Sequence, residues 1–265
     1  ILISYWEAYN DAEKRRLDTL ETRRGVRLIP RRKMASSQNA ELANFLEGFG
    51  NKTIFNTFNR FKKPIFFIPI STVVQYDFPE KKDFEKAKKH FLWIGGGGAV
   101  LKGLDITLEA FIKMADLHLH VCGPIYGEKD FTDEYRKELE ETSNIHVYGR
   151  LDVAGDKFNE ILNKCSSVIY PSGGEGTSGA IVQAMHAGLV PIITHETGIQ
   201  EESGYIALDN PSIESIIKIA REFSNIESNK IREESRRIWN YAREHYTREK
   251  FSDAYKKFIT EILKL

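Results

Sequence analysis

Five short apolar runs recur at regular spacing through the second part of the chain. "HFLWIGG", "LHLHVCG", "NIHVYG", "SSVIYPS" and "LVPIITH" begin near residues 90, 117, 144, 166 and 189, which are 22 to 27 residues apart. Stretches typical of helices lie between them, such as 105–115 and 133–141. Buried apolar strands that alternate with helices are typical of βαβ units. We therefore predict an α/β fold, a Rossmann-like parallel sheet with helices on both faces.

The residues before these runs predict a partial second α/β domain. Charged helix formers fill 7–24, and "RLIP" at 27–30 and "KKPIFFIPIS" at 62–71 are strand candidates. One helix and two strands cannot enclose a core alone, and the chain begins with Ile1, so we expect part of a longer protein. The predicted divisions are the incomplete end of an N-terminal domain (1–75), a linker (76–89), a ligand-binding domain (90–245) and a C-terminal amphipathic helix (246–265).

Composition excludes several classes of protein. The 265 residues include 38 basic and 38 acidic side chains, and 41% are hydrophobic, which is atypical of nucleic-acid binders and of disordered chains. Cys122 and Cys165 lie in or beside apolar runs, so we expect free buried thiols and a cytoplasmic location. The run at 64–70 is far shorter than the roughly 18 residues of a membrane span. Peripheral membrane contact through the basic stretch 23–33 is the alternative to a solvated face.

A glycine-rich bend follows the fourth run, in "VIYPSGGEGTSGAIVQAMHAG". Gly174, Gly176 and Gly179 fit the G-x-G-x-x-G pattern, and Glu196 lies where a dinucleotide site has its ribose acid, so an NAD-dependent oxidoreductase stays open. That pattern normally follows the first strand of its domain, however. Glu175 would also place a negative charge against a pyrophosphate.

A nucleotide diphosphate carrying a sugar gives the glutamate a role. The helix start near Ser178 would bind the phosphates, and Glu175 would accept hydrogen bonds from sugar hydroxyls. A second phosphate element is present in "WIGGGGAVLKG" at 93–103, where Lys102 is expected to be an exposed cation at a glycine turn. Both bends follow the carboxyl ends of strands, where open parallel sheets bind ligands.

These segments resemble a known family. "LWIGGGGAVLKGLDITLEAF", "LHLHVCGP", "NIHVYGRL" and the bend above are similar, in that order, to the donor-binding domain of group 1 retaining glycosyltransferases with the GT-B fold. The resemblance is close over about 90–200 and looser over 200–265. The segment 51–71 resembles the end of the family's N-terminal domain.

The resemblance implies a role for each matching residue. Lys102 would hold the diphosphate, and Glu175 would orient the sugar as the other catalytic residue. Gln183 stands where the family usually has a second glutamate that holds the ribose, and a neutral amide accepts hydrogen bonds more weakly than a carboxylate. The remaining implied donor-binding residues are Gly96, Gly97 and Gly98 beside the diphosphate, Tyr148, Gly149 and Arg150 beside the base, and Gly176, Thr177, Ser178 and Gly179 with backbone N–H groups toward sugar and phosphate.

The function that follows is transfer of a sugar from a nucleotide diphosphate donor to a hydroxyl of a glycan or lipid-linked saccharide, as in polysaccharide biosynthesis. The resemblance implies retention of configuration. No cofactor and no metal are expected: His118 and His120 share a strand face without an evident third ligand, and no two aspartates lie two positions apart. A non-catalytic nucleotide-sugar binding domain is the remaining alternative.

Overall fold

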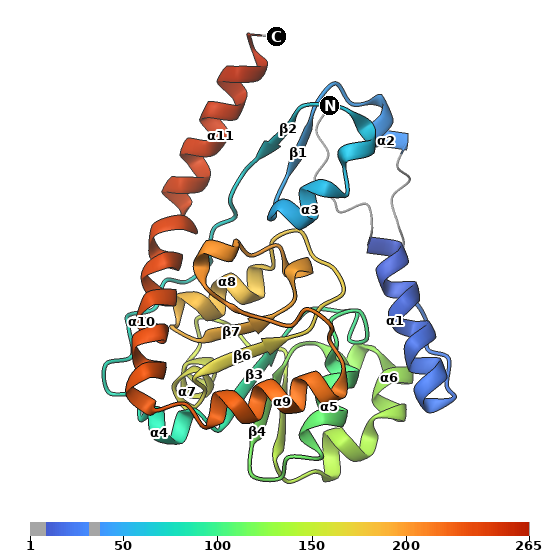
Figure 1. The fold of residues 1–265 in the computed structure, drawn as a ribbon, viewed down its shortest axis with the longest axis vertical. Helices are drawn as coiled ribbons and strands as arrows, with labels where there is room; N and C mark the ends of the chain where they lie inside the picture. The colour runs from blue at the N-terminus through green and yellow to red at the C-terminus, as the bar shows by residue number, and fades with distance from the viewer. Residues whose placement is uncertain (1–8, 32–37, 265) are drawn as a thin grey trace.

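The computed structural model describes residues 9–31 and 38–264, which form a large lobe and a small lobe (Figure 1). Six parallel strands form the sheet of the large lobe, in the order β5-β4-β3-β6-β7-β8. Their bounds are β3 (His90–Ile94), β4 (His118–Cys122), β5 (Ile145–Gly149), β6 (Ser167–Tyr170), β7 (Val190–Ile193) and β8 (Ile206–Ala207). The Rossmann-like sheet and its five expected strands are confirmed, and β8 is an additional edge strand of two residues.

The strand order contains one reversal. From β3 the chain passes to β4 and β5 on one side of the sheet, and β6, β7 and β8 then extend from the other side of β3. The loops after β3 and β6 therefore leave adjacent strands in diverging directions. Open α/β sheets bind ligands at such a switch point, outside the carboxyl ends of the strands.

Helices cover both faces of this sheet. On one face α5 packs on α9, and on the other α8 packs on α10 and α7 on α4. Asn144 ties the turn after α5 to the start of β5, because its side-chain amide donates to the carbonyls of Phe111, Met114 and Leu117. The helical segments are α4 (Phe84–Ala87), α5 (Leu104–Phe111), η2 (Ile125–Gly127), α6 (Lys129–Glu134), the π-helical η3 (Lys137–Glu141), α7 (Asp156–Lys164), α8 (Gly179–His186), η4 (His195–Thr197), η5 (Glu201–Ser203), α9 (Ile213–Ser224) and α10 (Ser228–His245).

The small lobe has a two-stranded parallel sheet, in which β1 (Leu46–Gly48) pairs with β2 (Ile65–Phe67). Its helices are α2 (Gln38–Leu42), α3 (Lys52–Asn56) and η1 (Asn59–Phe61). Leu46, Ile54 and Phe58 form its core, and Leu101 from the loop after β3 packs into the same cluster. The loop after β3 thus contacts the cores of both lobes.

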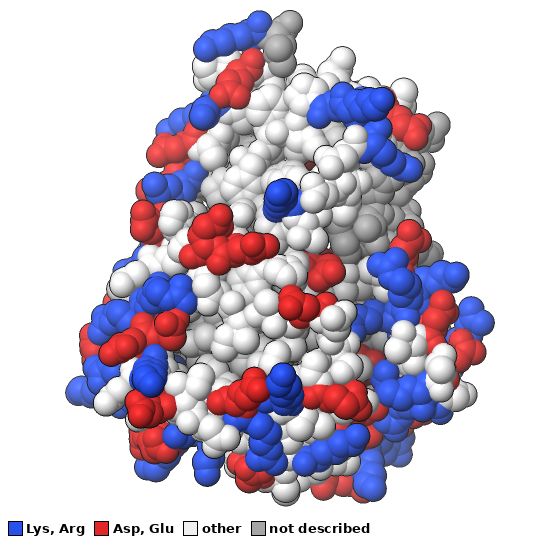
Figure 2. Space-filling view, in the orientation of Figure 1, with Lys and Arg blue, Asp and Glu red and all other residues white. Residues whose placement is uncertain are grey.

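The predicted N-terminal helix forms as α1 (Tyr9–Arg24), and it packs on the large lobe through Leu20. Arg23 pairs with Asp105 at 2.7 Å, and Arg24 pairs with Glu134 and Glu138 at 2.7 and 2.8 Å. Figure 2 shows basic and acidic side chains interspersed over this part of the surface. Both of these arginines of the basic stretch at 23–33 are therefore engaged in ion pairs within the protein.

The strand predicted at 27–30 is wrong. This segment, with Arg31, follows α1 as an extended strap rather than a strand. The main-chain N–H of Ile29 donates to the Asp130 carboxylate and that of Arg31 to Glu13, at 2.8 and 2.9 Å. Side-chain acceptors take the place of a neighbouring strand here, so an apolar and β-branched run was insufficient to specify pairing.

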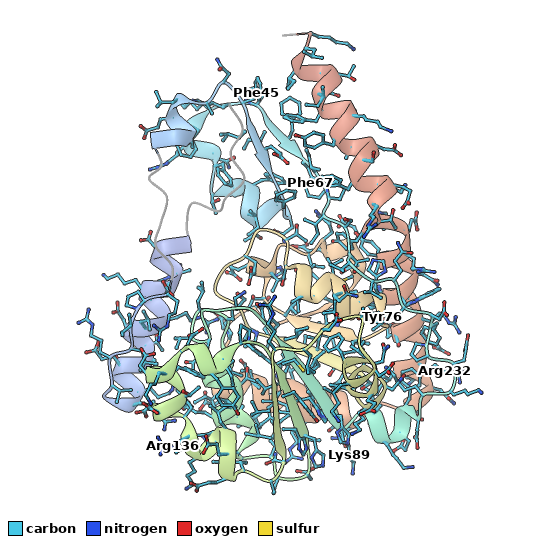
Figure 3. All side chains as sticks on the ribbon, turned by 180° about the vertical axis from the view of Figure 1, so that it is seen from behind. Phe45, Phe67, Tyr76, Lys89, Arg136 and Arg232 are labelled. Atoms are coloured by element: carbon cyan, nitrogen blue, oxygen red, sulfur yellow. The ribbon has the colours of Figure 1, made fainter. Side chains whose placement is uncertain are left out.

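The C-terminal helix α11 (Arg248–Ile262) crosses back to the small lobe (Figure 1). Phe258 is buried there, with its ring 5.0 Å from that of Phe66 and 6.2 Å from that of Phe45, which Figure 3 labels. Leu263, on the apolar face predicted from the sequence, is 81% exposed. The face is therefore only partly used for packing in the described residues.

Candidate functional site

The two glycine bends lie side by side at the switch point of the sheet. One follows β3 over 95–103, and the other follows β6 over 171–178. The main-chain N–H of Gly173 donates to the carbonyl of Leu101 at 2.7 Å, which joins them directly. Gly103 has φ +69°, and a Cβ there would lie 2.5 Å from the Pro171 carbonyl oxygen, so only glycine allows this close approach.

Lys102 and Glu175, predicted independently from the two bends, meet across this junction. The Lys102 ammonium lies 2.6 Å from Glu175 Oε1, and the Tyr170 hydroxyl lies 2.9 Å from both groups. The Lys102 and Glu175 side chains are only 7% and 15% exposed. Lys102 is therefore not the exposed cation expected from its glycine turn, because the loop folds its side chain inward onto the neighbouring bend.

Tyr170 was missed by the sequence interpretation. It is the last residue of β6 and is fully buried, so the apolar run that contains it reads simply as core. Its hydroxyl is the acceptor for Lys102 and the donor to Glu175. A tyrosine as the final residue of a strand just before a functional bend was the available signal.

The glycines after β3 divide into two groups. Gly96 and Gly97 are exposed, and a Cβ at Gly96 would meet no atom within 4 Å. Gly98 is buried with φ +90°, and its N–H donates to Glu128 Oε1 at 2.5 Å. Glu128 lies in the loop after β4. The sequence interpretation also missed it, because it belongs to no motif and no neighbouring residue indicates a functional role.

Tyr148, Gly149 and Arg150 lie at the carboxyl end of β5, two strands away from β3. The Tyr148 hydroxyl lies 2.9 Å from His120 Nδ1, and Gly149 accepts a hydrogen bond from the Gly123 N–H at 2.8 Å. Arg150 is exposed. These residues share the sheet edge of Lys102 but make no hydrogen bond or ion pair with it in the described structure, and their place beside a base stays a prediction.

The bend after β6 is braced by the segment after β7. Glu175 and Ser178 donate their main-chain N–H groups to the carbonyls of Glu196 and Thr197, at 2.8 and 2.9 Å. Gly176 and Thr177 are half-buried between them, and Gly179 begins α8. The Ser178 N–H, one of those predicted to face a donor, is thus used within the fold, as is the carbonyl of Glu196.

Gln183 holds the linker between the lobes, which is the segment 68–83 between β2 and α4. It is 4% exposed, its Oε1 accepts from the Thr72 hydroxyl at 2.8 Å and the Val74 N–H at 3.3 Å, and its Nε2 donates to the Val74 carbonyl at 2.7 Å. Tyr76, labelled in Figure 3, follows on the same linker and donates to the Val153 carbonyl. Gln183 therefore has a packing role, and contact with a ribose stays a prediction.

His118 and His120 belong to a ladder of four histidines on one face of the sheet, with His90 from β3 and His146 from β5. His90 Nδ1 lies 2.9 Å from His120 Nε2, and His118 Nδ1 lies 3.2 Å from His146 Nε2. Burial lowers the pKa of His120 to about 3 and that of His90 to about 4, and repulsion from the neighbouring histidines adds to both. Among residues 9–31 and 38–264, no group of three or more metal-ligating side chains is arranged to hold an ion.

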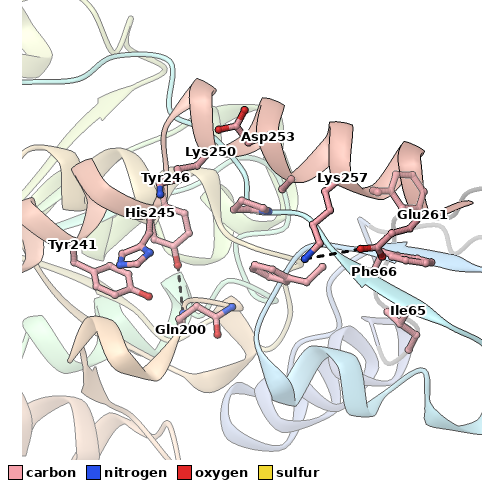
Figure 4. Close-up of a pocket in the computed structure, with 14 residues that line it drawn as sticks. Ile65, Phe66, Gln200, Tyr241, His245, Tyr246, Lys250, Asp253, Lys257 and Glu261 are labelled. Atoms are coloured by element: carbon pink, nitrogen blue, oxygen red, sulfur yellow. Dashed lines mark hydrogen bonds and ion pairs between the residues drawn. The ribbon is translucent and has the colours of Figure 1, made fainter.

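A groove of about 610 Å³ lies elsewhere, between α11 and the small lobe (Figure 4). Phe66, Tyr241 and Tyr246 line it, and Lys257 pairs with Glu261 at 3.9 Å along its wall. It shares no residue with the two glycine bends. The chemistry predicted from the sequence is therefore concentrated at the switch point and not in this groove.

Comparison with known proteins identifies the family and the fold of the chain. A family model described as "Glycosyl transferases group 1" matches residues 88–222, half of the chain. No curated protein matches the sequence. In the part of the chain that the structure describes, no helix has the length and apolar character needed to cross a membrane.

Solved glycosyltransferases share the fold at low sequence identity. HepE from Anabaena, solved with UDP-glucose, has TM-score 0.67 and 11% identity, with 98% of this chain and 72% of that chain covered. A glycosyltransferase from Rickettsia africae has TM-score 0.67 and 14% identity, with 90% and 69% covered. WaaG, involved in lipopolysaccharide biosynthesis, has TM-score 0.59 and 16% identity, with 80% and 61% covered. The chain spans about half of the length of other similar structures, such as TarM from S. aureus, of which it covers 44%. The large lobe thus has the architecture of GT-B glycosyltransferase folds, and the chain belongs to the group 1 glycosyltransferases.

Proposed function

We propose that this chain binds a nucleotide diphosphate sugar and, within the whole protein, transfers the sugar to a hydroxyl of a saccharide or lipid-linked acceptor. The observation that carries the proposal is the meeting of Lys102 and Glu175 across the switch point, 2.6 Å apart. HepE and TarM, which share the fold, were solved with UDP-glucose and UDP respectively. Those ligands make UDP the first nucleotide to test.

The proposed chemistry is electrostatic. Negative charge grows on the leaving diphosphate as the bond to the sugar breaks, and a preorganised ammonium at Lys102 would stabilise that charge without a metal. Glu175 would then exchange its partner, releasing Lys102 to phosphate and accepting hydrogen bonds from sugar hydroxyls. The transfer is proposed to retain configuration, as the family resemblance implies.

Three arginines of the basic stretch at 23–33 form ion pairs within the protein. Arg23, Arg24 and Arg31 pair with acids of the large lobe, which leaves them poorly suited to lipid headgroups. A lipid-linked acceptor therefore needs another contact surface. Binding to vesicles with and without anionic lipid measures this directly.

The test is calorimetric titration of the chain with UDP, GDP, their glucose conjugates and NAD, followed by Glu175→Gln. We expect the variant to bind the bare diphosphate at least as tightly as wild type, because it frees Lys102 from its carboxylate partner. We expect it to bind the sugar conjugate about tenfold more weakly, since charged acceptors form the stronger hydrogen bonds. Equal losses for both ligands would remove Glu175 from the sugar. Binding of NAD without response to either diphosphate would instead favour the oxidoreductase alternative.

A further inference from the structure

Glu128 is an acid buried against the glycine bend after β3. It is 7% exposed, and its carboxylate accepts from the Gly98 N–H at 2.5 Å and from the Ala99 N–H at 3.2 and 3.1 Å. Two consecutive main-chain N–H groups that converge on one anion form a nest, the arrangement that binds phosphate in many proteins. The carboxylate thus takes the position that a phosphate oxygen would take.

The strap after α1 holds this acid in place. Arg31 Nε lies 3.5 Å from Glu128 Oε2, and the same guanidinium pairs with Asp130. The Ile29 N–H donates to Asp130 as well. One arginine therefore serves two carboxylates, and the strap covers the side of the bend on which Glu128 lies.

Both phosphate-binding elements at the switch point are consequently paired with internal carboxylates. Glu175 occupies the Lys102 ammonium, and Glu128 occupies the Gly98 and Ala99 amides. Glu175 has a second use in the proposed function, because it would turn to the sugar. Glu128 has none, since its carboxylate faces the loop amides and Arg31.

We propose that Glu128 is an internal anion that competes with the donor's diphosphate for the Gly98 and Ala99 N–H groups and thereby lowers the affinity of the site for the nucleotide. The inference rests on the proposed function, because it takes the bend after β3 as part of the donor site. A phosphate oxygen and the Glu128 carboxylate cannot accept from the same two N–H groups at once. The two negative charges would also repel each other at such short range. Diphosphate binding therefore requires Glu128 to withdraw toward Arg31.

The experiment compares Glu128→Gln with Asp130→Asn as the matched control. Asp130 shares Arg31 with Glu128 but accepts no hydrogen bond from the described residues of the bend. The probes are UDP, GDP, uridine, guanosine and inorganic pyrophosphate, titrated after thermal melting confirms folding. We expect Glu128→Gln to bind the diphosphates and pyrophosphate about tenfold more tightly, with nucleosides and the control variant changed less than about twofold.

A gain confined to phosphate-bearing probes is a result that a purely structural role would not give. Unchanged or weaker diphosphate binding by folded Glu128→Gln would overturn the competition. If wild type still binds UDP in that case, the proposed function stands. Tighter pyrophosphate binding without nucleotide binding keeps the competition and overturns the proposed function. If no protein binds any probe, both fall.

A second variant covers failure of Glu128→Gln to fold. Glu128→Asp keeps the charge and shortens the side chain by one methylene, which draws the carboxylate away from the loop amides. We expect it to bind pyrophosphate about threefold more tightly than wild type. No gain in this folded variant would also overturn the competition.

Discussion

The two halves of the sheet differ on either side of the switch point. In the half formed by β6 and β7 every strand residue is buried, whereas β3 and β5 include half-buried positions and carry part of the histidine ladder. The loops that follow these strands also differ in how buried they are. The bend after β6 is braced by the segment after β7, and the bend after β3 has two exposed glycines.

This difference gives the two halves different roles: one supports the backbone of the candidate site, and the other leaves part of the site open to a ligand. The buried half holds the main chain of Glu175 through a hydrogen bond to the segment after β7. The half containing β3 has the buried Lys102 and the exposed Gly96 and Gly97 on a loop that also contacts the small lobe through Leu101. A ligand at the junction would therefore contact two different walls. The rigid wall is the braced bend after β6 (171–178), and the adjustable wall is the loop after β3 (95–103).

The largest effect is expected at the brace of the buried half. Gly198 has φ +72°, and a Cβ there would lie 1.6 Å from the carbonyl oxygen of Gly176. Gly198→Ala combines this clash with an unfavourable backbone conformation, so we expect it to lower the free energy of unfolding by about 4 kcal/mol or more. Urea unfolding measures the loss. A loss of less than about 1 kcal/mol, one-quarter of the expected loss, would show that the brace is not rigid.

The second effect concerns the pair that joins the two walls. Lys102→Ala leaves Glu175 nearly buried without its cation, and breaking such a pair costs about 3 kcal/mol. Removing both charges in Lys102→Met with Glu175→Gln should recover most of that loss. Lys129→Ala, which breaks the exposed pair with Asp133, is the control and should cost less than about 0.5 kcal/mol. An equally small effect at Lys102 would contradict the buried pairing.

The histidine ladder gives the half containing β3 a dependence on pH. The lowered pKa of His120, about 3, means that the unfolded chain takes up this proton first, near pH 6.5, so stability falls as the pH drops below that value. Between pH 7 and pH 5 we expect His120 to contribute a loss of about 2 kcal/mol. Urea unfolding of wild type and His120→Leu at both pH values isolates it. Parallel losses in the two proteins would assign the effect to other groups.

Much of this arrangement was predictable from the sequence. The spacing of apolar runs predicts the strands because each must be buried on both faces of a parallel sheet, and Lys102 and Glu175 follow from the glycine bends after two of them. Glu128 was not predictable, because its role arises from contacts with residues distant in sequence, whereas Tyr170 had only its place at the end of β6 as a signal. The strand at 27–30 failed for the same reason: its main-chain partners are side chains at positions 13 and 130.

Gln183 stands at the position to which the family resemblance assigns a ribose contact, but in the structure its side chain contacts the linker. Gln183→Glu removes the N–H that donates to the Val74 carbonyl and places an anion there, so we expect a loss of about 1.5 kcal/mol at pH 7. The sequence alone predicts tighter binding of UDP or GDP by this variant. Thermal unfolding and nucleotide titration of the same samples separate the two expectations. Tighter ribonucleotide binding with unchanged stability would favour the ribose role over the linker contact.

The smallest effect on stability is expected at Gly96, on the adjustable wall. Its backbone is outside the left-handed region, and a Cβ would meet no atom within 4 Å, so Gly96→Ala should change the free energy of unfolding by less than about 0.5 kcal/mol. Nucleotide affinity is the informative measurement. If the diphosphate approaches this backbone as closely as the sequence predicts, the added methyl group should weaken UDP or GDP binding about fivefold while leaving uridine and guanosine unchanged. Equal affinity for wild type and Gly96→Ala would place the phosphates farther from the first exposed glycine, toward Lys102.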